Sequence, residues 1–408
     1  MIDNTIKSAI AFILLILFLL TGCDSSNISE WTILVYMAAD NSLNEAAIDD
    51  INEMESGYFS DDIAVIVQID SREGNLYDFY PGARRYEILP EISQDPNFIS
   101  SPLIASMGEI DSGSYQAIAD FSNWGFARYP SEKRALVIWS HGNGWYDAYN
   151  RFCPDNESGS SISIPEGELA AALSSIHYHL DILLLDACNM QCLEVLAEAY
   201  PYTDYIIGSE NSVCTDGFPY SDILTSWEAF GPTNTICSEI IDLYINSYLP
   251  GGSQYQPGIN PSLTASAVDT KKFPQLRDEL TQFCELFTST AGEPYFAQAR
   301  NNCIEFNDLD ADVDLKEFFT SLAEQNVPQE LLAFSQSFDL TIEEVFFAYD
   351  YYNLLSSQVG TATIWFPDSE NTFEDLIQLY NELSLAETGW SNFLSAFLDL
   401  EKKAYPVR

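Results

Sequence analysis

The sequence predicts an α/β fold with a mostly parallel central sheet, followed by a C-terminal region of mixed helices and strands. The main observation is a series of short apolar segments, such as residues 63–69 (IAVIVQI) and 181–185 (DILLL). Continuous apolar segments of this length are typical of strands that are buried on both faces of a parallel sheet. Helix-like segments separate them, and this alternation favours βαβ units with helices on both faces of the sheet.

The predicted elements follow one another along the chain. The strands are predicted at residues 31–37 (WTILVYM), 63–69, 135–139 (ALVIW), 181–185 and 205–208. The helices are predicted just after residue 42, where Ser42 and Glu45 form a capping box, and at residues 165–176 and 193–199. Glycines and prolines in residues 251–261 mark a connection, and two further strands are predicted at residues 263–268 and 361–366. We therefore expect a main domain at residues 31–250 and a C-terminal region, packed on it, at residues 251–408.

The N-terminal segment has the features of a bacterial lipoprotein signal. Lys7 precedes an apolar run at residues 9–20, which is too short for a membrane-spanning helix but suits the core of a secretory signal. The run ends in LTGC, which resembles a lipobox and implies that Cys23 is lipidated and becomes the mature N-terminus. We predict a signal peptide at 1–22, a tether at 23–30 and an extracytoplasmic location, at the cell surface or in the periplasm, with membrane contact through the lipid anchor only. The alternative is an ordinary signal peptide with an incidental cysteine.

The composition limits the kinds of partner that the protein can have. The 408 residues include 16 Lys plus Arg and 62 Asp plus Glu, a net charge of −46, which argues against nucleic acid as a partner. With 47% hydrophobic and 13% aromatic residues, the chain can form a large core, so the acidity does not indicate a disordered tail. The acidity has two interpretations, which are a solvated, self-repelling surface and a field that attracts cationic substrates.

Two residues at one edge of the predicted sheet form a candidate catalytic pair. Ligands and reacting groups of open α/β sheets gather where the strands end at their carboxyl edge. The strand at 135–139 leads into His141, the strand at 181–185 leads into Cys188, and one helical crossover would place these two strands side by side. A thiol beside an imidazole can serve as a nucleophile with its acid/base partner.

The remaining cysteines and histidines fit this assignment. Eight cysteines minus Cys23 leave seven, an odd number, so at least one thiol is expected to be free or paired outside the chain. The others can equally be small buried apolar residues. His177 and His179 precede the strand that leads to Cys188, so we expect them at its opposite end, on the surface.

The chain resembles the clostripain family of cysteine endopeptidases, in the caspase-like group that includes gingipain and legumain. The likeness lies in the segments at residues 31–55, 135–145 (ALVIWSHGNGW), 181–195 (DILLLDACNMQCLEV) and 208–220 (GSENSVCTDGFPY), with weaker echoes at 312–319 and 360–367. The ordered pair of SHG and DAC motifs is the specific part of the signal. The resemblance implies a caspase-like αβα sandwich, with the catalytic domain at residues 31–250.

The resemblance also implies roles for individual residues. His141 matches the catalytic histidine and Cys188 the nucleophile, while the backbone N–H groups of Gly142 and Cys188 would bind the oxyanion. Asp186 and Asp216 match positions that line the S1 pocket and select Arg or Lys, where carboxylates form charge-assisted bonds with a cation. The alternatives are a structural strand-end carboxylate for Asp186 and a turn residue for Asp216.

Activation and metal binding have further candidate residues. Arg151 is the only basic residue between Ala135 and Thr270, and members of the family can cut themselves at a basic residue in this linker, so Arg151 is a candidate autoprocessing site. An ordinary exposed arginine is the alternative. The run from Asp308 to Asp314 fails the EF-hand pattern, and Asp314 suits a helix start instead. We predict no metal site and no cofactor, although some relatives depend on calcium and a calcium requirement stays open.

These features together predict a lipid-anchored cysteine endopeptidase that cleaves protein or peptide substrates after Arg or Lys. A second hypothesis is a catalytically silent, acidic surface lipoprotein that binds cationic peptides or metal ions with the same fold. A third is a cysteine hydrolase that acts on a non-peptide amide.

Overall fold

The fold is described from a computed structural model of the chain. The structure describes residues 28–72, 82–90, 98–146, 152–306, 312–356 and 359–404. Cys23 and Arg151 lie outside these ranges. Within them, no helix combines the length and the apolar character that crossing a membrane requires.

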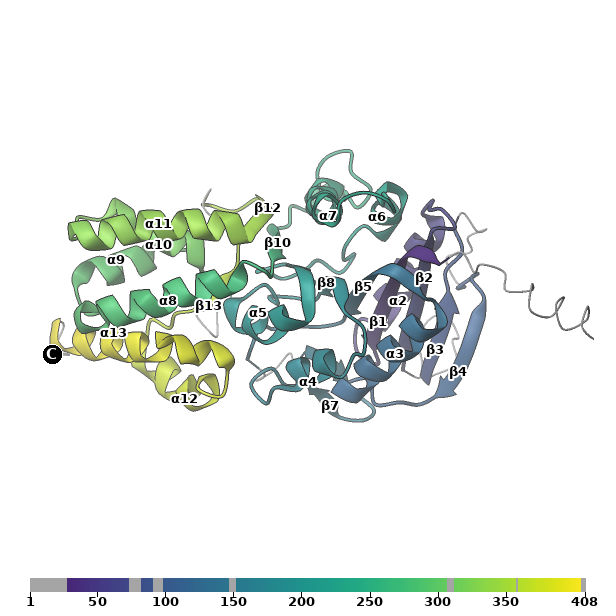
Figure 1. Cartoon of the computed structure of the whole chain (residues 1–408), viewed down its shortest axis with the longest axis horizontal. Helices are drawn as coiled ribbons and strands as arrows, with labels where there is room; N and C mark the ends of the chain where they lie inside the picture. Colours follow the sequence, from purple (N-terminus) through teal and green to yellow (C-terminus); the bar gives the residue numbers. More distant parts are fainter. Residues whose placement is uncertain are drawn as a thin grey trace, which may run out of the picture.

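A nine-stranded sheet forms the centre of the α/β part (Figure 1). Its strands, in spatial order, are β12 (Phe346–Tyr352), β10 (Leu263–Asp269), β9 (Thr203–Gly208), β8 (Leu180–Asp186), β5 (Ser131–Trp139), β1 (Ser29–Ala39), β2 (Ile63–Ser71), β3 (Gly82–Glu87) and β4 (Leu103–Gly108). The strands from β9 to β2 are parallel to one another, whereas β3, β4, β10 and β12 pair antiparallel at the two edges. The predicted α/β fold with a mostly parallel centre is confirmed. Two strands of this sheet, β10 and β12, come from the part of the chain after residue 250.

Helices cover both faces of this sheet, because the side chains of each central strand point alternately to two apolar cores. Leu34 and Tyr36 of β1 belong to one core, and Val35 and Met37 belong to the other. The first core is closed by α3 (Tyr115–Arg128), α4 (Glu168–Ser174) and α5 (Leu193–Ala199). The second is closed by α2 (Asn44–Ser56), α6 (Tyr220–Ser226) and α7 (Thr233–Ser247).

The C-terminal region forms a helical bundle beside the sheet (Figure 1). Its helices are α8 (Phe273–Phe287), α9 (Pro294–Asn302), α10 (Leu315–Glu324), α11 (Gln329–Val345), α12 (Glu370–Tyr380) and α13 (Trp390–Ala404). An aromatic cluster around Phe283, Phe319 and Trp390 fills the bundle and continues into the core behind α5. Two small antiparallel sheets, β6 (Phe152–Asp155) with β7 (Ser160–Ile162) and β11 (Asp312–Asp314) with β13 (Thr363–Trp365), complete the fold.

The start of α2 differs from the sequence-based expectation. The predicted capping box of Ser42 and Glu45 is wrong, because the helix begins one residue later, with Leu43 as its N-cap and without a side-chain cap. Asn41 Oδ1 accepts the hydrogen bond from the Leu43 N–H at 2.9 Å instead. The hydroxyl of Ser42 is therefore available for a different contact, described below.

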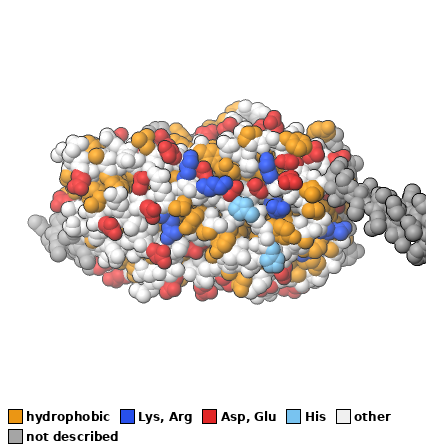
Figure 2. Space-filling view, in the orientation of Figure 1, with side chains coloured by type: hydrophobic (Ala, Val, Ile, Leu, Met, Phe, Trp, Pro, Cys, Tyr) orange, Lys and Arg blue, Asp and Glu red, His pale blue; other side chains and the backbone are white. Residues whose placement is uncertain are grey.

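The negative charge is distributed over the molecule. On the face in Figure 2, acidic side chains are spread along the whole length, over both the bundle and the α/β part. The acidity predicted from the sequence is therefore not confined to one site. It gives the protein a general negative electrostatic potential. A binding role for a particular group of carboxylates therefore has to be argued from the geometry of that group.

Candidate active site

The candidate catalytic residues follow neighbouring strands at the carboxyl edge of the sheet. Parallel pairing of β5 with β8 places Trp139 opposite Asp186. The Ser140 N–H continues the ladder by donating to the Asp186 carbonyl at 3.2 Å. His141 and Cys188 therefore leave the sheet at the same edge, as the sequence predicts.

One cavity joins these residues. A cavity of about 160 Å³ is lined by Leu43, Trp139, Ser140, His141, Asp186, Cys188, Val213, Cys214, Thr215 and Gly217. A cavity needs only about 10–15 Å³ to hold one water molecule. A cavity of about 160 Å³ is therefore many times larger than one water site and has room for a substrate side chain. The structure thus brings His141, Cys188 and Asp186 to a common cavity.

Gly142 packs directly against the loop that carries Cys188. A Cβ atom at position 142 would lie 2.7 Å from the Cys188 carbonyl oxygen and 2.9 Å from the Ala187 Cβ. Such distances are shorter than van der Waals contact, so only glycine allows the two loops to come this close. The backbone amide of the residue after His141 is thereby held next to the loop that carries Cys188.

Two contacts position His141. The Ser42 Oγ lies 2.7 Å from the His141 Nε2, and the direction of this hydrogen bond depends on the tautomer. The Cys153 N–H donates to the His141 carbonyl oxygen at 3.2 Å. Burial lowers the pKa of His141, so the imidazole is neutral at neutral pH.

The thiol of Cys188 also favours its neutral form. Its Sγ lies 3.7 Å from the Val213 carbonyl oxygen. Burial raises the pKa of Cys188, and the charge of Asp186 raises it further against opposing hydrogen bonds from the backbone of Val213 and from Ser212. The resting pair is therefore a neutral thiol and a neutral imidazole.

Asp186 is a buried carboxylate beneath the cavity. It is 3% exposed, and its Oδ2 accepts a hydrogen bond from the Tyr220 hydroxyl at 2.7 Å. Burial raises the pKa of Asp186 to about 6, while the hydrogen bonds from Tyr220 and from the Phe218 backbone oppose the shift. Asp186 is therefore mostly ionised at pH 7.

Asp50 of α2 is a second buried carboxylate at this place. A Cβ atom at Gly217 would lie 3.3 Å from an oxygen of Asp50 and 3.3 Å from an oxygen of Asp186, so both carboxylates flank this glycine. The Trp139 indole donates to the Asp50 Oδ2 at 2.6 Å. Burial and the neighbouring charge of Asp186 raise the pKa of Asp50 well above its usual range.

Asp216 lines an adjoining cavity. This cavity of about 450 Å³ shares Cys214 and Thr215 with the smaller one and is otherwise lined by Asp216, Tyr248, Gln254, Gln256, Ile259 and Pro261. The Gln256 amide donates to the Asp216 Oδ2 at 2.7 Å. The two predicted specificity residues thus lie on neighbouring cavities, with Asp186 on the side of Cys188.

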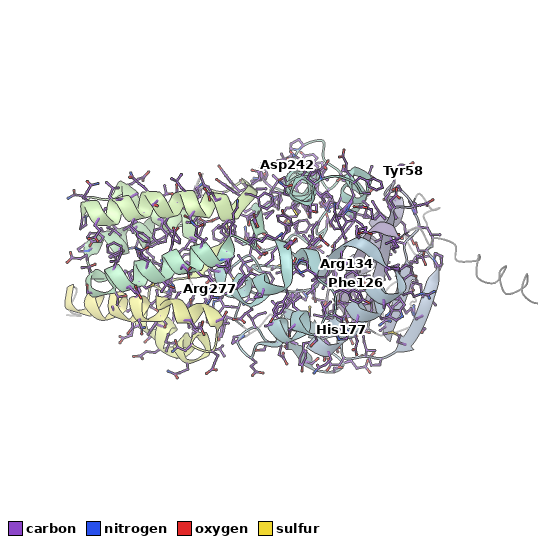
Figure 3. All side chains as sticks on the ribbon, in the orientation of Figure 1. Tyr58, Phe126, Arg134, His177, Asp242 and Arg277 are labelled. Atoms are coloured by element: carbon purple, nitrogen blue, oxygen red, sulfur yellow. The ribbon has the colours of Figure 1, made fainter. Side chains whose placement is uncertain are left out.

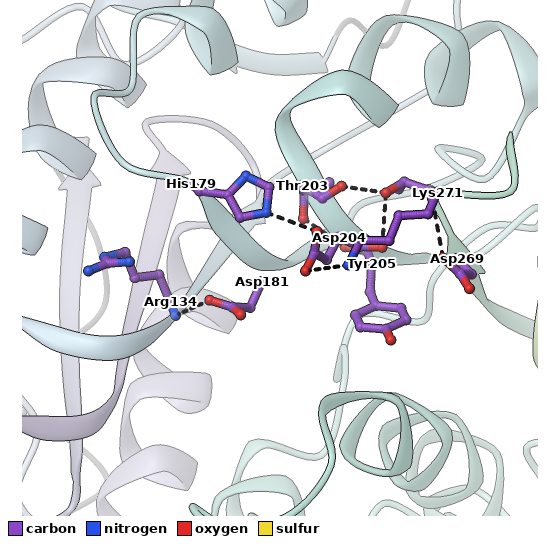
Figure 4. A network of polar contacts seen from close by, with 9 residues as sticks. Arg134, His179, Asp181, Thr203, Asp204, Tyr205, Asp269 and Lys271 are labelled. Carbon is purple, nitrogen blue, oxygen red and sulfur yellow. Dashed lines mark hydrogen bonds and ion pairs between the residues drawn. The ribbon is translucent and has the colours of Figure 1, made fainter. Parts of the chain in front are cut away.

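The other histidines lie away from this edge. His177 is exposed on the α/β part, where Figure 3 labels it. His179 is 58% exposed and its Nε2 lies 2.9 Å from Asp204, which also contacts Lys271 at 2.9 Å (Figure 4). Both are surface residues, as predicted, and neither lines the cavity of Cys188.

The other residues that the sequence analysis singled out either have structural positions or lie outside the described residues. The described cysteines, from Cys153 to Cys303, are all unpaired, and most of them are buried as small apolar residues. Asp314 caps α10 by accepting from the Glu317 N–H at 2.7 Å, which confirms the predicted helix start. Asp308 and Asp310, like Cys23 and Arg151, lie outside the described residues.

Two residues of the site escaped the sequence-based prediction. Ser42 follows β1 at the same carboxyl edge as His141, so the edge argument applied to every strand would have included it. Asp50 lies three residues after Ala47 and one before Ile51, on the apolar stripe of α2. A carboxylate on a buried stripe is a signal in itself, because such groups require a specific partner.

Comparisons with known proteins agree with this geometry. The model of the clostripain family matches residues 35–397. Clostripain of Hathewaya histolytica is 27% identical over 240 residues, which is 50% of this chain and 43% of that protein, so the chain spans less than half the length of this curated relative.

Two solved structures have the same fold over most of the chain. An inactive zymogen of a C11 protease from Parabacteroides distasonis aligns with a TM-score of 0.66 and 20% identity, covering 89% of this chain and 98% of that one. A secreted C11 cysteine protease from Bacteroides thetaiotaomicron, in complex with an irreversible peptide inhibitor, aligns with a TM-score of 0.65 and 20% identity, covering 88% and 98%. These likenesses confirm the predicted fold, and the match to the family model shows that the chain belongs to the clostripain family of peptidases.

Proposed function

We propose that the protein is a cysteine endopeptidase in which Cys188 is the nucleophile and His141 the acid/base partner, and that it cleaves after Arg or Lys. The observation that carries the proposal is the shared cavity, which joins a thiol, an imidazole and a buried carboxylate at one sheet edge. Membership of the clostripain family supports the reaction class.

The resting state suggests how the reaction begins. Because thiol and imidazole are both neutral, His141 can accept the Cys188 proton as Sγ attacks the scissile carbonyl. The protonated His141 then donates to the departing amine, and the neutral imidazole later assists the water that hydrolyses the thioester. The N–H groups of Gly142 and Cys188 stabilise the oxyanion, and each such donor typically contributes about 2.7–4 kcal/mol in the transition state.

Asp186 links substrate choice to this chemistry. Its negative charge raises the pKa of Cys188, so a guanidinium or ammonium group bound to Asp186 would offset that effect and favour the thiolate. A basic P1 side chain would thus activate the nucleophile as it binds. Asp50 supports the cavity floor from α2, and Asp216 adds negative charge from the adjoining cavity.

Maturation and location are further parts of the proposal. We propose lipidation at Cys23, with residues 1–22 removed, and autoprocessing at the Arg151–Phe152 bond. A secreted relative from B. thetaiotaomicron and a zymogen relative from P. distasonis support an extracytoplasmic, processed enzyme. Mass spectrometry of fragments from wild type and Arg151→Ala tests the cleavage site, since an unchanged pair of fragments in the variant would refute it.

Peptide substrates that differ only at P1 test the specificity. We expect turnover with Arg or Lys at P1 and none with Gln. Asp186→Asn should lower kcat/KM for the basic substrates by at least about 30-fold, because removing one partner of a desolvated charge pair costs roughly 2–5 kcal/mol. Asp242→Asn, on the exposed side of α7 (Figure 3), is the matched control and should retain wild-type activity. Turnover with Gln but not Arg would favour an amide hydrolase, and basic peptides that bind without turnover would favour the silent binding protein.

A further inference from the structure

We propose that Cys188 and Cys214 form a reversible disulfide when the protein meets a peroxide, and that this disulfide inactivates the site. The proposal rests on the proposed function in one respect, the role of Cys188 as the nucleophile. The proposed mechanism does not use the thiol of Cys214. Both thiols are unpaired in this structure, and each belongs to a half-buried residue.

The two thiols lie at the same wall of the site. Both residues line the cavity of His141, and Cys214 also lines the adjoining cavity. The Sγ of Cys188 lies 3.7 Å from the carbonyl oxygen of Val213, whose peptide group connects directly to Cys214. Cys188 also acts electrostatically on Cys214. Among the residues that line these two cavities there is no other cysteine, so Cys214 is the thiol within reach of Cys188.

The chain around Cys214 can complete this approach without a change in the sheet. Two backbone hydrogen bonds hold the preceding residues against the loop of Cys188, from the Gln191 N–H to the Ser209 carbonyl at 3.0 Å and from the Asn189 N–H to the Asn211 carbonyl at 3.1 Å. Residues 212–214 then belong to no helix or strand and are exposed or half-buried. A disulfide requires Cα atoms about 4.4–6.8 Å apart, and a shift of this short segment alone can provide that spacing.

The surroundings of the two thiols decide which one reacts first. Cys188 shares its cavity with a neutral imidazole that can accept its proton, and the thiolate is the form that attacks an oxidant. Burial raises the pKa of Cys214 to about 11, and the charges of Asp216 and Cys188 add to the shift. Cys214 therefore stays protonated and does not react with a peroxide by itself. It is suited to a second step, in which it meets an already oxidised partner.

The oxidation has two balanced steps. In the first, Cys188 Sγ attacks one oxygen of hydrogen peroxide, the O–O bond breaks, and a sulfenic acid forms while the other oxygen leaves as water with the thiol proton. In the second, Cys214 Sγ attacks the sulfenic sulfur, the S–S bond forms, the S–O bond breaks, and water leaves with the Cys214 proton. Two thiols and one peroxide thus give one disulfide and two waters.

The disulfide would inactivate the enzyme and also protect it. It would occupy the sulfur that attacks the substrate, and it would lie in the cavity that Asp186 offers to a P1 side chain. A dithiol reductant restores both thiols by exchange. Without a nearby thiol, the sulfenic acid of Cys188 proceeds to sulfinic acid, which such a reductant does not reverse. In the extracytoplasmic location proposed above, no cytosolic thiol pool keeps the pair reduced, so the protection has a purpose.

Peptide mapping of the whole protein tests the proposal without peptidase activity. Reduced protein is freed of reductant, treated with a small excess of hydrogen peroxide, blocked with a thiol reagent and digested without reduction. Chymotrypsin is suitable because Tyr202 and Tyr205 lie between the two cysteines, whereas trypsin leaves both on one peptide. We expect a peptide pair that is linked through Cys188 and Cys214 and separates on reduction. A disulfide from Cys188 to another cysteine, or to a second chain, would overturn the proposal.

Matched variants test the consequence for activity, with each protein compared with its own reduced state. Peroxide should lower the activity of wild type at least about tenfold, and dithiothreitol should restore it. Cys214→Ala should lose activity that dithiothreitol does not restore, because Cys188 is oxidised beyond sulfenic acid. Cys303→Ala is the control, since Cys303 is also half-buried but its Sγ donates to the Ala299 carbonyl at 3.3 Å, away from both cavities.

The outcomes separate this proposal from the proposed function. Full recovery of Cys214→Ala by dithiothreitol, or unchanged activity of peroxide-treated wild type, would refute the role of Cys214. A reduced wild-type protein without peptidase activity would instead refute the proposed function. The linked peptide pair should form in that case as well, because its formation requires only the two thiols and the peroxide.

Discussion

Replacing Gly142 by alanine separates two loops that the proposed mechanism requires to be in contact. The new Cβ would lie 2.7 Å from the Cys188 carbonyl oxygen, 2.9 Å from the Ala187 Cβ and 3.0 Å from the Met190 Cγ. Two of these neighbours are backbone or Cβ atoms that cannot rotate away. The loop of His141 must therefore move by several tenths of an ångström relative to the loop of Cys188.

The magnitudes follow from this displacement. Added volume in a packed site typically costs about 1–3 kcal/mol of stability. The larger effect is on catalysis, because the Gly142 N–H would leave the oxyanion position, and loss of one such donor lowers kcat by about 10²–10³. The carboxylate of Asp186 is held by the Tyr220 hydroxyl and the Phe218 backbone, which are not among the clashing atoms, so KM should change much less than kcat.

Steady-state kinetics with an arginyl peptide substrate, together with urea unfolding, measures both effects. Gly231→Ala is the matched control, because its Cβ would also be crowded, with a nearest contact of 3.1 Å, but lies outside both cavities. The control should retain wild-type kcat. A Gly142→Ala variant with wild-type kcat would refute the close approach of the two loops as a requirement for catalysis.

Three further predictions concern single contacts of the site and the core. Ser42→Ala removes the hydrogen bond to His141 and should lower kcat about fivefold at unchanged KM, since a neutral hydrogen bond contributes about 1 kcal/mol; an unchanged kcat would argue against a positioning role. Because the pKa of Asp186 is about 6, the inhibition constant of benzamidine should rise as the pH falls below 6, and a flat profile in wild type would contradict cation binding by this carboxylate. Burial raises the pKa of Glu194 from 4.5 to about 7, so its contribution to stability is present below pH 4.5 and lost as the pH rises through 7. Urea unfolding at pH 5 and 8 should show a loss of up to about 3 kcal/mol in wild type that Glu194→Gln lacks, and equal pH dependence would refute it.

The central strands, and the sheet edge that carries the candidate catalytic residues, could be predicted because they rest on local patterns. Apolar runs such as ALVIW and DILLL are buried on both faces, and no other element accommodates them as well. If these two parallel strands are neighbours, the residues that follow them, His141 and Cys188, must lie at the same edge of the sheet. No other information is needed for this prediction. The antiparallel edges were harder to predict, since β3 contains the sequence GARRYE and β4 is largely exposed.

The supporting contacts depend on residues that are distant in the sequence. Ser42 and His141 are 99 positions apart, and Asp186 receives its hydrogen bond from Tyr220, 34 positions later. Such contacts follow from how the chain returns to one edge, which periodicity alone does not determine.

Covalent labelling tests the central claim most directly, namely that Cys188 is the nucleophile of a site that accepts a basic side chain. An arginyl peptide with a thiol-reactive group is incubated with the reduced, calcium-supplemented protein, and the modified residue is identified by mass spectrometry. We predict modification at Cys188 in wild type and in Cys214→Ala, whose thiol lines the same cavity, and none in Cys188→Ala. Absence of labelling in wild type, or labelling that persists in Cys188→Ala, would contradict the assignment.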